Sequence, residues 1–69
     1  MKRTELIGKI RKEARKAKVE WELVRQGARH EIWRLGDLQV SIPRHREVNE
    51  LTAQGILRDT EDELGEGWW

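Results

Sequence analysis

The chain has 69 residues, a net charge of +1 from 14 basic and 13 acidic side chains, and no cysteine. A chain of this length forms one small domain, which buries only about 60% of the surface that the unfolded chain exposes. Without cysteine there are no disulfides and no cysteine-based zinc sites, a composition typical of the reducing cytoplasm. No stretch resembles a membrane span or a signal peptide. We expect one soluble cytoplasmic domain over residues 1–64, followed by a flexible tail over 65–69.

The charges are segregated along the chain. Residues 1–18 carry eight basic and two acidic side chains, whereas residues 47–69 carry one basic and seven acidic side chains. Such segregation lets one face attract a polyanion although the total charge is small. The alternative is that the two regions are solvated helix surfaces of opposite sign.

The first predicted element is an amphipathic helix that begins at Thr4 as its N-cap. Its apolar stripe consists of Leu6, Ile7, Ile10, Ala14 and Ala17. The opposite side is basic and consists of Arg11, Lys12, Arg15, Lys16 and Lys18. These positions predict a helix with one buried face and one strongly basic flank.

The pattern then changes to period two, which is typical of half-buried strands over 20–23, 30–35 and 38–42. Gln26-Gly27-Ala28 separates the first two strands, and Gly36-Asp37 predicts a tight hairpin because glycine tolerates a positive φ. Pro43 ends the third strand because it cannot donate to the ladder.

In the second strand we place Trp33 and Leu35 inward, since they bury more apolar area than their neighbours. Strict alternation then directs His30, Ile32 and Arg34 to the open face of the sheet.

The segment from Arg44 to Val48 is expected to be a loop, and Asn49 is the expected cap of a second helix. The buried stripe of that helix consists of Ala53, Ile56, Leu57 and Thr60. Gly55 either weakens the helix by about 1 kcal/mol or marks a close packing contact. Trp68 and Trp69 follow a glycine-rich acidic segment and either hang free or pack back on the core.

A helix, a three-stranded antiparallel meander and a second helix define an α+β fold, the two-layer αβββα sandwich with both helices on one face. Double-stranded-RNA-binding domains have the same order of elements.

Two segments carry side chains suited to chemistry on phosphates. The imidazole of His30 can take up and release a proton, while Arg34 offers a planar fork of donors to a phosphate. Arg44, His45 and Arg46 form a compact basic loop suited to phosphate contact. The alternatives are an ordinary exposed histidine and a solvated turn. No metal-binding cluster or phosphate-cradling glycine motif occurs, so no metal or cofactor is expected.

Two longer segments carry a family resemblance. The run Trp21-Glu22-Leu23-Val24-Arg25-Gln26-Gly27-Ala28-Arg29-His30-Glu31-Ile32-Trp33 resembles the signature of the HicA family. The run Ser41-Ile42-Pro43-Arg44-His45-Arg46-Glu47-Val48-Asn49 is similar to the family's block before its last helix, and Ile56-Leu57-Arg58-Asp59 resembles that helix. The resemblance covers about residues 4 to 60. The chain departs from it in Gly27-Ala28-Arg29, in its longer basic first helix and in its acidic tail.

The resemblance implies the toxin of a type II toxin–antitoxin system, an mRNA interferase with the αβββα fold that a HicB-type antitoxin protein neutralises. It also implies that His30 is the catalytic residue. We expect His30 to act as the general base of a metal-independent endoribonuclease, with His45 or a water molecule as the acid. The expected RNA contacts are Arg29, Arg34, Arg44, His45, Arg46, Lys12, Arg15 and Lys16. The alternatives are a non-catalytic RNA-binding module and a protein-interaction domain.

Overall fold

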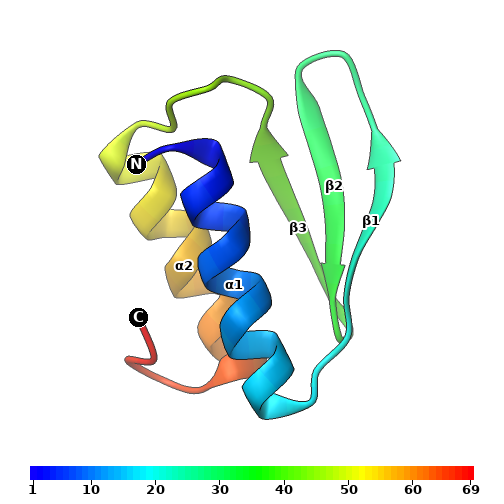
Figure 1. The fold of residues 1–69 in the computed structure, drawn as a ribbon, viewed down its shortest axis with the longest axis vertical. Coiled ribbons are helices and arrows are strands. Elements are labelled where there is room, and N and C mark those ends of the chain that lie inside the picture. Colours follow the sequence, from blue (N-terminus) through cyan, green and yellow to red (C-terminus); the bar gives the residue numbers. More distant parts are fainter.

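The computed structural model describes residues 1–69 and contains α1 (Arg3–Ala17), β1 (Trp21–Gln26), β2 (His30–Leu35), β3 (Leu38–Pro43) and α2 (Glu50–Leu64). The three strands form one antiparallel sheet in the order β1-β2-β3. Both helices lie on the same side of this sheet (Figure 1). The αβββα arrangement predicted from the sequence is therefore confirmed.

The core fills the space between the helices and the inner face of the sheet. It consists of Leu6, Ile7, Ile10, Ala14, Trp33, Leu35, Val40, Ile42, Val48, Ala53, Ile56, Leu57 and Leu64. Trp33 and Leu35 point inward as predicted, and the half-buried Trp21 stacks on Trp33 with ring centroids 4.6 Å apart. The buried stripe predicted for α2 is also confirmed, including Thr60, whose hydroxyl donates to the Leu57 carbonyl at 2.6 Å.

The ends of α1 differ from the prediction. The helix begins at Arg3, and its N-cap is Lys2 rather than Thr4, with no hydrogen bond from the capping side chain. Instead, Lys2 pairs with Glu47 through an isolated β-bridge, which fixes the entry of the chain into the helix. Ala17 is exposed rather than buried, because α1 ends there in a left-handed Lys18 at φ 59°.

The two helices run in the same direction, with their first residues side by side (Figure 1). The Val48 amide donates to the Met1 carbonyl at 2.8 Å, and the Met1 amino group donates to the Val48 carbonyl at 3.1 Å. A hydrogen bond to the Glu50 carboxylate raises the pKa of this amino group above its usual 8.0. Asn49 caps α2 as predicted, accepting from the Leu51 amide at 2.8 Å. Neither helix is long and apolar enough to cross a membrane.

The predicted Gly36-Asp37 hairpin turn is confirmed, with Gly36 at φ 58°. Gly55, in contrast, does not mark a close packing contact, because a Cβ built there meets no atom within 4 Å. The tail folds back along α2, where the Trp68 indole donates to the Thr60 hydroxyl at 3.0 Å and packs on the core. Of the two alternatives for Trp68, the structure shows packing on the core; the flexibility of residues 65–69 stays a prediction.

Candidate functional site

The face of the sheet that the helices leave open carries His30. Its side chain is exposed, and its partner across the sheet is Pro43, the last residue of β3. Pro43 directly precedes the basic loop of Arg44, His45 and Arg46. His30 therefore lies at the end of the sheet where this loop and the turn between β1 and β2 meet.

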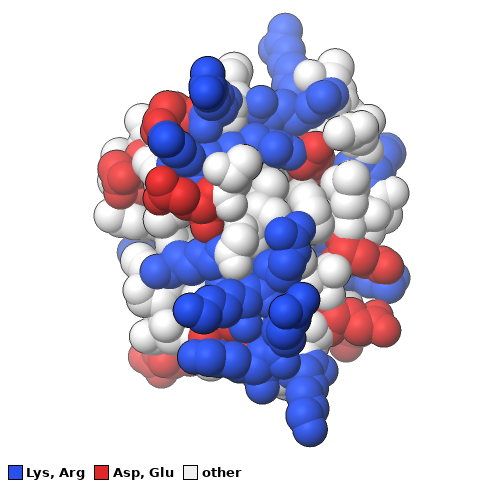
Figure 2. All heavy atoms as spheres, viewed as in Figure 1, with Lys and Arg blue, Asp and Glu red and all other residues white.

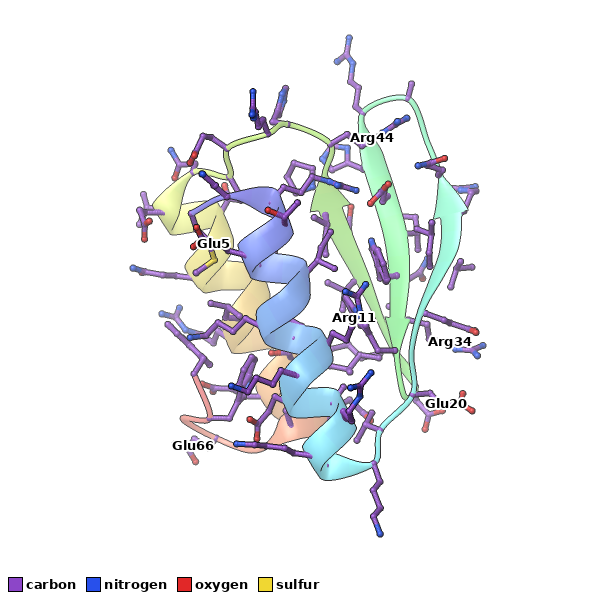
Figure 3. All side chains as sticks on the ribbon, viewed as in Figure 1. Glu5, Arg11, Glu20, Arg34, Arg44 and Glu66 are labelled. Atoms are coloured by element: carbon purple, nitrogen blue, oxygen red, sulfur yellow. The ribbon has the colours of Figure 1, made fainter.

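Arg34 shares the open face, as predicted, but it does not lie near His30. Four residues along a strand separate the two by about 13 Å. The Arg34 guanidinium forms ion pairs with Glu22 and, at 3.6 Å, with Glu20. Figure 3 places Arg34 and Glu20 away from the end of the sheet that carries Arg44. Arg34 is thus already partnered by carboxylates and remote from the histidine.

A β-bulge in β1 brings a different arginine toward His30. The register of β1 on β2 shifts between Leu23 and Arg25, so that Arg25 pairs with Ile32 and shares the face of His30. A residue in this diagonal position lies about 7–8 Å away, within reach of a long side chain. Arg25 is exposed and forms no ion pair. It is the open-face arginine nearest in register to His30, and it is not among the contacts predicted from the sequence.

Arg44 connects the two loops at this end of the sheet. Its amide donates to the Arg29 carbonyl at 2.9 Å, and its guanidinium donates to the Gly27 carbonyl at 2.8 Å. The Gly27 amide in turn donates to the His30 carbonyl at 2.8 Å. A Cβ at Gly27 would stand 2.9 Å from that same carbonyl oxygen, which explains the glycine. These contacts fix the turn before His30 against the basic loop.

Two depressions that share Arg44 open beside this junction. One, of about 330 Å³, is lined by Ala28, Arg29, Arg44 and His45. The other, of about 340 Å³, is lined by Lys2, Arg3, Thr4, Arg44 and Arg46. Neither lining contains a carboxylate. We call the two together the cationic groove; its residues are suited to binding phosphate oxygens. The structure thus brings together Arg29, Arg44, His45 and Arg46 of the predicted contacts.

A buried carboxylate holds the N-terminus of α1 against β2. Glu31 is only 4% exposed and accepts hydrogen bonds from Gln26 at 3.0 Å and Trp33 at 3.2 Å. It also forms an ion pair with Arg3, whose amide donates to the Arg46 carbonyl at 2.9 Å. Glu31 follows His30 directly and therefore links the catalytic candidate to one wall of the cationic groove. This role of Glu31 could not be predicted from the sequence, because alternation alone does not identify a buried ion pair.

The basic flank of α1 lies elsewhere and is divided in two. Lys12 and Lys16 line a depression together with Lys9, whereas Arg15 lines a different one together with Arg11, Val19 and Trp21. None of these basic residues forms an ion pair. Lys and Arg side chains gather over the C-terminal half of α1 and again at the end of the molecule that carries the N-terminus (Figure 2). Arg11 extends from α1 toward the sheet (Figure 3).

The two histidines are free to meet a ligand. No side-chain hydrogen bond in the structure involves the imidazole of His30 or of His45. His45 lines the cationic groove, whereas His30 stands beside it on the sheet. No group of three or more His, Cys, Asp or Glu side chains is arranged to hold a metal ion. The arrangement offers exposed proton carriers next to unpaired cations, which suits proton transfer on a phosphodiester.

No family model, no curated protein and no solved structure matches this chain.

Proposed function

We propose that the chain is a metal-independent endoribonuclease that uses His30 as its general base. The observation that carries the proposal is the position of His30, exposed at the end of β2 next to the cationic groove. RNA carries a phosphate, which the groove can bind, and a neighbouring 2′-hydroxyl, which the imidazole can deprotonate. A proton carrier beside cations is what cleavage through that hydroxyl requires.

In the proposed reaction, the Nε2 or Nδ1 atom of His30 takes the proton of a 2′-hydroxyl. The oxygen then attacks the adjacent phosphorus, and the bond from phosphorus to the 5′-oxygen breaks. The products carry a 2′,3′-cyclic phosphate and a 5′-hydroxyl. Arg29 and Arg25 stabilise the charge that develops on the phosphate. His45, in the groove, gives a proton to the leaving 5′-oxygen.

The resemblance to HicA toxins supports a biological setting for this reaction. We place the chain in the cytoplasm as the toxin of a type II toxin–antitoxin pair, with mRNA as its substrate and a HicB-type protein as its antitoxin. An antitoxin that inhibits the reaction would cover His30 and neutralise the groove, which predicts an acidic complementary surface on that partner.

Cleavage of a labelled single-stranded RNA in EDTA tests the role of His30. The His30→Ala variant is expected to cut about 10²- to 10⁴-fold more slowly than the wild type, the usual range for a general acid or base. Gln39→Ala is the matched control, because Gln39 is exposed and pairs with Arg34, away from His30. His45→Ala is expected to reduce the rate as well. Equal rates for wild type and His30→Ala would refute the proposal.

A second candidate function is an RNA-binding module that does not cut. It is favoured by the absence of a hydrogen-bonded partner that would orient the imidazole of His30. A general base is ordinarily oriented by such a partner, although these contacts often form only with substrate bound. RNA binding without turnover in the same assay would favour this module.

A further inference from the structure

The tail and α1 together form a depression on the side of the molecule that the proposed reaction does not use. It measures about 220 Å³ and is lined by Lys9, Lys12, Glu13, Lys16 and Trp68. The three lysines are spaced three and four residues apart, so they share one face of α1. None of them forms an ion pair. A tryptophan ring thus lies among free ammonium groups, with one carboxylate in the lining.

Trp68 is held in place by its own contacts. Its indole donates to the Thr60 hydroxyl at 3.0 Å, and Thr60 is fully buried. The ring packs on the core on one side and lines the depression on another. It stacks on no other aromatic ring of the chain. The indole is therefore both fixed and partly open to a ligand.

We propose that this depression is a binding subsite for an unpaired nucleotide of a single-stranded RNA. The ring of Trp68 stacks on the base, and Lys9, Lys12 and Lys16 contact the neighbouring phosphates. Positive grooves with aromatic side chains are the common solution for single-stranded nucleic acid, because every base has a π-face. A base inside a duplex is already stacked on its neighbours and does not fit this mode.

The subsite deepens the proposed function and rests on it for the identity of the ligand. Lys2 lines the cationic groove and Lys16 lines the subsite, and fourteen residues of helical rise separate them by about 21 Å. The proposal therefore predicts that RNA extends along α1 from the cleavage site toward the tail. It also gives Trp68 a role in choosing unpaired substrates.

Binding to a non-cleavable 2′-O-methyl oligoadenylate, compared with an abasic oligonucleotide of equal charge, tests the subsite. Trp68→Leu is expected to weaken binding of the oligoadenylate by about 5- to 150-fold, the range for loss of one stacked base, and to leave abasic binding unchanged. Trp68→Phe keeps a ring and should retain most of the affinity. Trp69→Leu is the matched control, because the Trp69 indole donates to Glu61 at 2.7 Å and does not line the depression.

Two results would overturn the subsite. One is equal affinity of the wild type for both oligonucleotides; the other is a loss for Trp68→Leu that is the same with and without bases, which indicates a structural role. Either result, together with His30-dependent cleavage, removes the subsite and leaves the proposed function standing. A wild type that binds neither oligonucleotide contradicts both proposals.

Discussion

Gly27 shows how closely a single residue controls the candidate site. Its amide donates to the His30 carbonyl, and its own carbonyl accepts from Arg44. The backbone is so close at this point that any side chain would meet the His30 carbonyl oxygen. The position of His30 thus depends on the absence of a Cβ at Gly27, three residues earlier in the chain.

Gly27→Ala is expected to lower the free energy of unfolding by about 1–3 kcal/mol, because the backbone it meets cannot rotate away as a side chain would. Gly8→Ala is the matched control. Gly8 lies inside α1 with nothing within 4 Å of an added Cβ, so the substitution should stabilise the chain by about 0.8–1 kcal/mol. Urea denaturation of the two variants measures both changes. An unchanged midpoint for Gly27→Ala would show that the turn adapts freely.

The residues of the site were only partly predictable from the sequence. The direction of His30 followed from the large inward side chains of Trp33 and Leu35, and the structure confirms it. Alternation also places Arg34 on the face of His30, but Arg34 lies four residues further along the strand and pairs with two carboxylates, so it is not the cation nearest to the imidazole. Arg25 could not be found, because the bulge after Leu23 shifts the alternation of β1 without any local glycine or proline signal.

At the scale of elements, the two helices begin in different ways. The Asn49 side chain caps α2 by accepting from a backbone amide, whereas the Lys2 side chain makes no such bond at the start of α1. The entry into α1 is fixed instead by backbone contacts with Glu47 and Val48. One helix therefore depends on a capping side chain and the other on a neighbouring segment.

Asn49→Ala is expected to lower the free energy of unfolding by about 1 kcal/mol, the usual value of a lost N-cap. Lys2→Ala should change it by less than about 0.5 kcal/mol, since an exposed side chain without a capping bond is removed. Thermal unfolding followed by circular dichroism compares the two. A loss at Lys2 as large as that at Asn49 would contradict this account of the helix starts.

The order and type of every element were predictable because their signals are local. Apolar residues at helical or alternating spacing identify the helices and strands, and Gly36 identifies the hairpin. The start of α1 could not be predicted, because a β-bridge between residues 2 and 47 replaces a local cap. The packing of Trp68 on Thr60 likewise depends on a tertiary contact that no periodicity encodes.

Across the whole molecule, the distribution of charged side chains says more about binding than the net charge does. The net charge is only +1, yet the cations of the lysine side of α1, and those of the cationic groove apart from Arg3, form no side-chain ion pairs. Arg34, in contrast, is matched by Glu20 and Glu22. Only cations that form no ion pair should release counterions from RNA when they bind it. The affinity for RNA should therefore fall steeply as the salt concentration rises.

The slope of log affinity against log salt concentration distinguishes an arginine without an ion pair from one that is already paired with carboxylates. For a single strand, each phosphate contact contributes about 0.7 to the magnitude of this slope, so Arg46→Gln should lower it by about 0.7. Arg34→Gln should leave it unchanged, because Arg34 is already neutralised. Titration of a labelled 2′-O-methyl oligonucleotide measures both slopes. An equal decrease for the two variants would show that Arg34 also contacts the RNA.

The most direct test of the proposed RNA cleavage asks whether the wild-type chain needs the attacking 2′-hydroxyl. A labelled RNA is incubated in EDTA beside the same sequence with 2′-deoxy sugars throughout. We predict that both strands are bound and that only the RNA is cut, leaving 2′,3′-cyclic phosphate and 5′-hydroxyl ends. Cleavage of the deoxy strand, or an RNA that is bound and stays intact, would contradict it.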